Sequence, residues 1–308
     1  MAGQKRTVKD MPDQSGKVIV VTGANSGLGY ETSLALARQG AHVALACRNM
    51  EKGETAVTQI RQQVPDASLE LMALDLADLA SIRQFAQDFR ASHDRLDVLI
   101  NNAGIMAIPY RQTADGFEMQ FGVNHLGHFA LTGQLIDLIT QTDDSRVVTV
   151  SSNLHKQGKI DFENLNSERD YSKWGAYNNS KLANLLFAYE LQRRLAVSGS
   201  KTISAAAHPG YASTNLQSGD SSWLQKLMLG LGNVILAQSA AMGALPTLYA
   251  ATMPDVRGGD YYGPGGMGEM RGHPVKVQSN GSSHNEGTAV KLWQVSQELT
   301  GVAFLDNE

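Results

Sequence analysis

The sequence has almost no cysteine and no long apolar run. Cys47 is the only cysteine among 308 residues, so no disulfide can form within the chain and a disulfide-stabilised secreted scaffold is excluded. No stretch of about eighteen apolar residues occurs, and the opening segment MAGQKRTVKDMPDQSGK contains no apolar core typical of a secretion signal. We therefore expect a cytoplasmic protein without a transmembrane segment.

An excess of charge of one sign is also missing. Lysine and arginine number 26 against 30 acidic residues, which gives a net charge of -4 and a pI near 6.1. The basic residues are scattered, so neither nucleic acid nor an anionic membrane is expected as an electrostatic partner. The remaining composition, 42% hydrophobic and 18% charged, is typical of a globular protein with a large core.

Short apolar or β-branched runs alternate with longer helical patterns from Lys17 onward. The runs are KVIVVT, HVALAC, SLELMALD, LDVLIN, RVVTVSS and TISAAAH. Helices are expected near residues 28–39, 50–63, 79–93, 117–141, 175–196 and 239–251. Such alternation predicts right-handed βαβ units, and hence an α/β Rossmann fold: a doubly wound parallel sheet with helices on both faces.

No repeat or proline-rich linker divides the chain. Residues 15–308 are therefore predicted to form a single dinucleotide-binding domain, preceded by a polar tail at residues 1–14. Two segments interrupt the alternation: a long insertion at residues 211–238, and a stretch at residues 257–287 that is rich in Gly, Ser and Asn.

The first predicted strand runs into TGANSGLG, residues 22–29, and a helical pattern follows directly. Glycines at such a position permit a tight turn and close approach of the backbone to a pyrophosphate, which the helix amino terminus attracts. The strand before and the helix after favour a dinucleotide loop over an ordinary strand-to-helix turn. The residues expected at the cofactor are Gly23, Asn25, Ser26, Gly27, Leu28 and Gly29.

The second strand ends in Cys47, Arg48 and Asn49, where an acidic residue would hold the ribose hydroxyls of NAD. A guanidinium instead suits a ribose 2′-phosphate, because its fork matches phosphate geometry. NADP(H) is therefore preferred over NAD(H), with Arg48 and Asn49 as contacts. The alternative is that Arg48 pairs with Glu51 and has no role in cofactor binding.

Two further strand ends lie at the same edge of the predicted sheet. Asp75 and Leu76 close the third strand, where Asp75 either meets the adenine amino group or caps the next helix, as Asp78 also could. After the fourth strand, NNAG at residues 101–104 predicts a turn. The residues there that are counted with the cofactor site are Asn102, Ala103 and Gly104.

Tyr177 and Lys181 lie four residues apart and therefore share one face of a predicted helix. A positive charge about 4 Å from a phenolate, at an effective dielectric of about 20, is worth about 4 kcal/mol. That would lower a tyrosine pKa from about 10 towards 7. Spacing alone fits an ordinary exposed helix pair equally well, so the other motifs must decide.

In order, TGANSGLG, NNAG, the serines at 151 and 152, YNNSK and HPG resemble the motifs of the short-chain dehydrogenase/reductase family. ACRN, TADGFE, GVNHLGHF and YNNSKLANLLF are most similar to its retinol dehydrogenase branch, a relative of the light-dependent protochlorophyllide reductases. The resemblance covers nearly the whole chain. It implies a catalytic tetrad of Asn124, Ser152, Tyr177 and Lys181. It also puts Pro209 and Gly210 beside the nicotinamide ring, with Thr214 in contact with the carboxamide of that ring or with a phosphate.

The resemblance further implies an NADP(H)-dependent alcohol dehydrogenase or carbonyl reductase. Tyr177 would donate a proton to the developing alkoxide, while Ser152 would orient the carbonyl. Ser152 is preferred over Ser151 because the family uses the second serine of the pair. Lys181 would bind the nicotinamide ribose and lower the pKa of Tyr177, and the Asn124 carbonyl would hold a water that links Lys181 to solvent.

The expected substrate is a small apolar carbonyl or alcohol, such as an aldehyde, a ketone or a retinal-like molecule. Its contacts are expected among Ile105, Met106, Ser152, His155, Tyr177 and Tyr211. The loop at 153–174, with Trp174, is expected beside the pocket. Apolar residues at helical spacing within 211–238 favour a substrate lid or a patch for transient membrane contact over a core-facing helix.

Three histidines have competing interpretations. His155 either touches substrate or is a solvated loop residue. His125 and His128 have a spacing that a metal could use, but no carboxylate or cysteine nearby completes a ligand set, so we expect core histidines and no metal.

Two other functions stay open: a nucleotide-sugar epimerase or dehydratase, which shares a Tyr and Lys pair, and a binding protein that senses NADP(H) without turnover. The substrate, the direction of reaction and the oligomeric state are not determined by the sequence.

Overall fold

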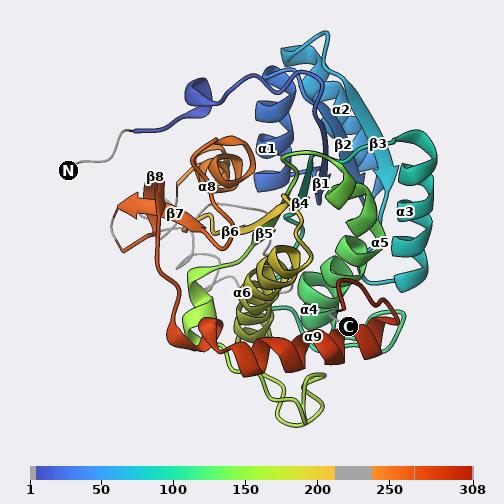
Figure 1. Cartoon of the computed structure of the whole chain (residues 1–308), viewed down its shortest axis with the longest axis vertical. Coiled ribbons are helices and arrows are strands. Elements are labelled where there is room, and N and C mark those ends of the chain that lie inside the picture. Colours follow the sequence, from blue (N-terminus) through green and yellow to red (C-terminus); the bar gives the residue numbers. More distant parts are fainter. Residues whose placement is uncertain (1–4, 212–237, 267, 307–308) are drawn as a thin grey trace.

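The computed structural model describes residues 5–211, 238–266 and 268–306 (Figure 1). Its centre is one sheet with the strand order β3-β2-β1-β4-β5-β6-β7-β8. The strands are β1 (Val18–Thr22), β2 (His42–Cys47), β3 (Leu69–Ala73), β4 (Val98–Asn101), β5 (Arg146–Val150), β6 (Ile203–Ala207), β7 (Tyr261–Gly266) and β8 (Arg271–Lys276). All neighbouring strands are parallel except β7 and β8, which are antiparallel.

Helices cover both faces of the sheet (Figure 1). On one face, α1 (Gly27–Arg38), α2 (Met50–Gln63) and α8 (Ala240–Thr252) share a hydrophobic core with the strands. On the other face, α3 (Leu79–Ser92), α5 (Gly127–Gln141) and α6 (Lys173–Val197) do the same, and α9 (Glu286–Thr300) packs over α5 and α6. The predicted doubly wound fold and its six strands and six helices are confirmed.

Shorter elements connect these layers. They are η1 (Val8–Asp10), α4 (Met119–Phe121), the π-helical turn η2 (Gly122–Leu126), η3 (Asn153–Gln157) and η5 (Gly281–His284). The turn η2 leads directly into α5, so the helix expected at 117–141 is one continuous element with a local widening. Such widened turns occur frequently at functional sites.

The strand order places a topological switch point at β1. The chain runs outward from β1 to β2 and β3, and then returns to β4 on the other side of β1. Crossovers on opposite faces leave a crevice at the carboxyl ends of β1 and β4, which is where ligands bind in open α/β sheets. The glycine loop and the NNAG turn therefore meet at this crevice.

Two segments contain more structure than the sequence predicted. The stretch at 257–287, for which no element was predicted, forms β7 and β8, and α9 follows it. Residues 8–14 are not a free polar tail: Met11 is 8% exposed and belongs to the core. The amide of Gln14 donates to the Gln39 carbonyl at 2.8 Å, so this segment is tied to the end of α1.

Among the helices of the described residues, none combines the length and the hydrophobicity that a membrane crossing requires.

Candidate active site

The glycine loop wraps closely around the carboxyl end of β1. Gly23 and Gly27 have positive φ angles of 66° and 54°, a conformation that side chains disfavour. A β-carbon on Gly29 would overlap the Gly23 carbonyl and come within 2.7 Å of Asn102 Nδ2. Ser26, at the N-cap of α1, makes no side-chain capping bond. Its helix therefore keeps free amide groups that can bind a phosphate.

Thr22 joins the glycine loop to the NNAG turn. Its hydroxyl accepts from the amides of Asn102 and Ala103, both at 2.9 Å, while the Asn102 side chain donates to the Thr22 carbonyl at 2.8 Å. The Thr22 hydroxyl also lies 2.9 Å from His128 Nε2, and His128 Nδ1 lies 3.0 Å from the Asn124 carbonyl oxygen. The two loops and α5 thus form one connected hydrogen-bond network.

The tautomer of His128 follows from these contacts. The Asn124 carbonyl can only accept, so Nδ1 carries the proton and Nε2 accepts from Thr22. Burial lowers the pKa of His128 to about 4, which keeps the ring neutral.

His125 is also buried, at 2% exposure, and its Nε2 lies within hydrogen-bond distance of the Ser296 hydroxyl. The prediction that both histidines belong to the core is confirmed, but His128 also connects site elements, which its sequence position did not reveal.

Arg48 is exposed at the carboxyl end of β2. Among the described residues its guanidinium makes no hydrogen bond or ion pair, so the alternative ion pair with Glu51 does not form. Asn49 is the N-cap of α2, and its side chain accepts from the Lys52 amide. Its contact with the cofactor remains a prediction.

The question of which aspartate caps α3 is resolved. Asp78 is the N-cap and accepts from the Ala80 and Ser81 amides. Asp75 instead accepts from the Ala77 amide at 2.9 Å, a local turn at the end of β3, next to Leu76. The cap alternative for Asp75 is therefore wrong, and its proposed contact with adenine remains a prediction.

Tyr177 and Lys181 lie on one face of α6, as their spacing predicted, but both are buried, with 6% and 4% exposure. Lys181 Nζ donates to the Val150 carbonyl at 3.1 Å and lies 5.7 Å from the centre of the Tyr177 ring. Burial lowers the pKa of Lys181 to about 8. The exposed helix pair, the competing interpretation, is excluded by this burial.

The pKa of Tyr177 moves opposite to the expected direction. Burial raises it to about 12, against a smaller lowering by a hydrogen bond with the Ser152 side chain. The ammonium of Lys181 donates to the Val150 carbonyl and lies 5.7 Å from the ring centre, and it does not offset the effect of burial on the pKa of Tyr177. The role of Ser152 beside the Tyr177 phenol remains a prediction.

The two serines after β5 differ in environment. Ser151 is buried and its hydroxyl donates to the Lys181 carbonyl at 2.8 Å, which fixes β5 to α6. Ser152 is half-buried and is the N-cap of η3, where its hydroxyl accepts from the Leu154 amide at 3.2 Å. The alternation of side chains along a strand separates these roles.

Asn124 lies in the π-helical turn η2 and is fully buried. Its side chain pairs with the Ile105 backbone, accepting from the amide at 2.9 Å and donating to the carbonyl at 3.0 Å, and also donates to Ser180. A β-carbon on Gly104 would lie 3.3 Å from Asn124 Oδ1 and 3.5 Å from Lys181 Nζ. Asn124 therefore holds the end of the NNAG turn against Lys181.

The substrate side is only partly as expected. His155 is 0% exposed; its Nδ1 lies 2.7 Å from the Ser152 carbonyl and its Nε2 accepts from the Asn280 amide. The solvated-loop interpretation is wrong, and a side chain without exposed surface argues against substrate contact as well. Trp174 is 45% exposed and its ring meets that of Tyr177 edge-on, 6.5 Å between centroids.

The other predicted contacts are placed around the same edge. Ile105, Met106, Pro209, Gly210 and Tyr211 are all half-buried. The segment 212–237, which contains Thr214 and nearly all of the predicted lid, lies outside the described residues.

A close contact between a histidine and a glutamate, which the sequence did not reveal, begins at the histidine of HPG, whose pKa burial lowers. His208 is fully buried, accepts from the Gly210 amide through Nδ1, and places Nε2 3.2 Å from a Glu269 carboxylate oxygen. The partners are 61 positions apart in the chain and join β6 to the β7–β8 turn. No local pattern could have paired them.

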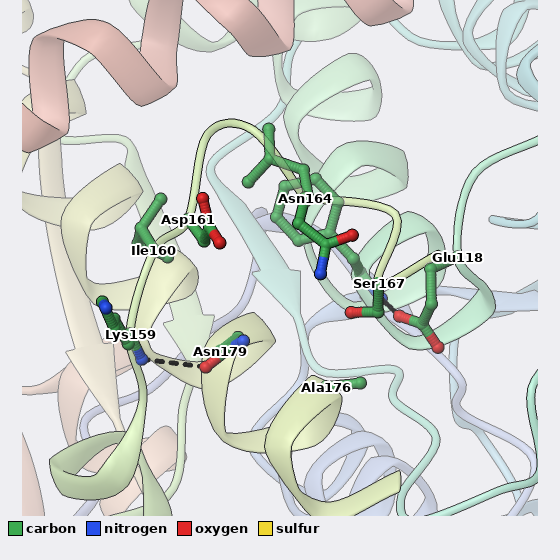
Figure 2. A pocket seen from close by; sticks show the side chains of 10 residues that line it. Glu118, Lys159, Ile160, Asp161, Asn164, Ser167, Ala176 and Asn179 are labelled. Atoms are coloured by element: carbon green, nitrogen blue, oxygen red, sulfur yellow. Dashed lines mark hydrogen bonds between the residues drawn. The ribbon is translucent and has the colours of Figure 1, made fainter. Parts of the chain in front are cut away.

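A separate small pocket lies beside the start of α6 (Figure 2). It is lined by Glu118, Phe121, Lys159, Ile160, Asp161, Asn164, Leu165, Ser167, Ala176 and Asn179. None of these belongs to the tetrad. The Lys159 amide donates to Asn179 Oδ1 at 2.8 Å, and the Tyr171 hydroxyl donates to the Ile108 carbonyl at 2.8 Å. These bonds tie the loop at 153–172 to α6 and to the segment after the NNAG turn.

Comparisons with known proteins agree with this geometry. A family model described as short chain dehydrogenase matches residues 17–225. Retinol dehydrogenase 14 of Mus musculus is 42% identical over 302 residues, covering 93% of this chain and 86% of the relative. Retinol dehydrogenase 12 of Homo sapiens is 41% identical over 304 residues, covering 98% and 91%.

Solved structures show the same fold. An uncharacterized protein from Mycobacterium paratuberculosis superposes with a TM-score of 0.82 at 44% identity, covering 98% of this chain and 99% of that one. A short chain dehydrogenase from Shigella flexneri 2a str. 301, complexed with NADP, reaches a TM-score of 0.63 at 23% identity, covering 81% and 96%. At that identity the second likeness concerns the fold alone.

Proposed function

Because the chain belongs to the short-chain dehydrogenase family and is a retinol dehydrogenase-like oxidoreductase, we propose that it transfers a hydride between NADP(H) and an apolar carbonyl or alcohol. The observation that carries this proposal is the buried pair of Tyr177 and Lys181 on one face of α6, with Lys181 Nζ 5.7 Å from the centre of the Tyr177 ring. This group lies at the carboxyl edge of the sheet, where the glycine loop also lies. We further propose that residues 15–308 act as one catalytic domain.

The crevice suits a dinucleotide. At Gly29 the loop has no space for a β-carbon, so the backbone itself can approach a pyrophosphate, and the open amides of α1 attract it. The exposed Arg48 guanidinium, which has no partner among the described residues, is available for a ribose 2′-phosphate. This supports NADP(H) over NAD(H), with Gly104 and Lys181 towards the nicotinamide end.

In the proposed reduction, NADPH held by the glycine loop, Arg48 and Lys181 would supply the hydride that the carbonyl carbon receives. The Tyr177 hydroxyl gives its proton to the carbonyl oxygen, so that the products are an alcohol and Tyr177 as the phenolate, which is then reprotonated from solvent. Ser152 donates to the same oxygen and holds it in place. A Tyr177 pKa of about 12 keeps the phenol protonated at neutral pH, which suits proton donation and therefore reduction.

An apolar substrate is supported by the side chains at the mouth of the site. Trp174 lies exposed against Tyr177, and Ile105 and Met106 follow the NNAG turn. The relatives named retinol dehydrogenases point to a retinal-like aldehyde or its alcohol as the first candidate. The single cysteine, Cys47, is buried and free, which fits the reducing cytoplasm that we propose as its compartment.

The test is NADPH oxidation by the purified protein against aldehydes, ketones, retinal and nucleotide sugars. Turnover of apolar carbonyls with NADPH, and weaker turnover with NADH, is the expected result. Activity confined to nucleotide sugars would favour the epimerase or dehydratase alternative. NADPH binding without turnover of any compound would favour a sensing protein.

A further inference from the structure

We propose that His42, Glu70 and His93 bind a divalent transition-metal ion, with Zn²⁺ as the best fit, at the amino-terminal edge of strands β2 and β3. One ligand atom from each of the three residues lies within 4.8 Å of the others. The site is separate from the proposed catalytic crevice, because His42 is the first residue of β2 whereas Arg48 follows its last. It does not depend on the proposed oxidoreductase function.

The sheet register brings the three side chains together. Ala44 pairs with Glu70 in the parallel ladder of β2 and β3, and side chains two positions apart point to the same face. His42 and Glu70 therefore point towards the face that α3 covers. His93 is the C-cap of α3, so the helix ends at this point (Figure 1). Its ring packs against Phe89, 4.5 Å between centroids, which fixes its direction.

The distances fit a metal after a small adjustment. Four ligands at bond lengths of 2.0–2.1 Å around Zn²⁺ lie about 3.4 Å from each other in a tetrahedron. Here Glu70 Oε2 lies 3.7 Å from His42 Nε2 and 2.7 Å from His93 Nε2. These values lie on either side of the tetrahedral separation. The three side chains are 14–30% exposed, so water can supply a fourth ligand.

The strongest indication is a buried ring nitrogen without a partner. His42 Nε2 is inaccessible to solvent and makes no hydrogen bond within the described part of the chain. The other nitrogen of the ring, Nδ1, lies 2.8 Å from the Ser68 hydroxyl. A hydrogen bond on the outer nitrogen is how proteins orient a metal-binding histidine. A metal ion would satisfy Nε2, which at 3.7 Å is too far from Glu70 for a hydrogen bond.

The ligand set also selects the metal. Two imidazoles and one carboxylate suit Zn²⁺ and its neighbours in the transition series, whereas Mg²⁺ and Ca²⁺ prefer oxygen ligands alone. With the ion bound, the single carboxylate leaves the site with a net charge of +1. Glu70 therefore contributes the largest electrostatic part of the binding free energy of the ion. A bound ion would tie β2, β3 and the end of α3 together and stabilise this outer edge of the sheet.

The experiment uses the full-length, tag-free protein after removal of metals with a chelator. Binding is measured by calorimetric titration with Zn²⁺. The melting temperature with and without Zn²⁺ gives the effect on stability, and the visible absorption of added Co²⁺ gives the coordination of the ion. We expect one ion per chain, a higher melting temperature with Zn²⁺, no effect of Mg²⁺, and Co²⁺ bands typical of four-coordination. NADPH binding should not change.

Three variants make the test specific. Glu70→Gln and His93→Gln keep side-chain size and should each weaken Zn²⁺ binding at least tenfold, while His284→Gln, which alters an exposed histidine elsewhere, should bind like wild type. Melting curves without metal verify that each variant folds. If His93→Gln does not fold, the test relies on Glu70→Gln, which is the more conservative substitution. Absence of Zn²⁺ binding by wild type, or unchanged binding by the folded Glu70 and His93 variants, would overturn the proposal.

Discussion

Lys181 Nζ donates to the Val150 carbonyl and stays 5.7 Å from the centre of the Tyr177 ring. The ammonium therefore anchors the end of β5 to α6 in the described state. Its own pKa is lowered to about 8 by burial, and that of Tyr177 is raised to about 12. Burial therefore disfavours the charged form of both groups, the ammonium of Lys181 and the phenolate of Tyr177.

The buried lysine makes the stability of the protein depend on pH. A folded-state pKa of about 8 lies below the usual value of 10.5. Between these values the unfolded chain binds a proton that the folded chain does not, so the contribution of Lys181 to the free energy of unfolding rises with pH by up to about 1.4 kcal/mol per pH unit. Below pH 8 its contribution is constant and at its least favourable.

Urea unfolding of wild type and Lys181→Met across pH 7–10 measures this contribution. The difference in free energy of unfolding, wild type minus variant, should grow above about pH 8. Lys52→Met, which removes an exposed positive charge, provides a control for the loss of a surface lysine. A flat difference for Lys181→Met would mean that its amine keeps an ordinary pKa.

Arg48→Ala should change cofactor preference. Removing the guanidinium takes away charge-assisted hydrogen bonds to a 2′-phosphate, worth about 1.5–3 kcal/mol. The KM for NADPH should therefore rise about 10- to 100-fold, while the KM for NADH stays the same. Lys52→Ala, one turn into α2, is the matched control for loss of a nearby positive charge. An unchanged NADPH preference in Arg48→Ala would remove Arg48 from the cofactor site.

Gly29→Ala should damage both the fold and the cofactor site. The added carbon would lie 2.7 Å from Asn102 Nδ2, and relieving such an overlap costs about 1–3 kcal/mol. Melting temperature and NADPH affinity, measured by fluorescence titration, should both fall. Gly281→Ala is the control, because a β-carbon there meets nothing within 4 Å. Equal behaviour of the two variants would contradict the close packing of the loop.

The two serines after β5 should separate stability from catalysis. Ser151→Ala removes the bond to the Lys181 carbonyl and should lower the free energy of unfolding by about 1 kcal/mol, with most of kcat retained. Ser152→Ala removes the hydroxyl beside the phenol and should lower kcat about 10²- to 10³-fold. Steady-state kinetics and urea unfolding of both variants test this. A large loss of kcat in Ser151→Ala, with kcat retained in Ser152→Ala, would contradict this assignment.

Much of the fold was predictable because its strands are buried on both faces. Runs such as VIVVT and VALAC have no polar interruption, and a helical pattern follows each. The strand β7, YYGPGG, contains glycine and proline and escaped this rule. The helix α9 was detectable: Asn285 caps it, and Ala289, Leu292, Trp293, Ser296 and Thr300 form its buried face. No helix was predicted there, although these signals were present.

The candidate site was predictable where motifs follow strands. The glycine loop, Ser152 and the α6 pair are local patterns, and the fold brings them to one edge. Long-range contacts were not predictable, as with His208 and Glu269 or Thr22 and His128. The pKa of Tyr177 was also beyond sequence reasoning, since spacing indicates a nearby lysine but reveals neither the burial of the pair nor the direction of the ammonium.

The central claim is that Tyr177 transfers the proton in an NADPH-dependent reduction. Single-turnover oxidation of bound NADPH by an apolar aldehyde, followed by the loss of its absorbance in wild type and Tyr177→Phe, measures that step directly. We predict that Tyr177→Phe binds NADPH with nearly unchanged affinity but oxidises it about 10²- to 10⁴-fold more slowly. Oxidation by Tyr177→Phe at a rate close to that of wild type would contradict the claim.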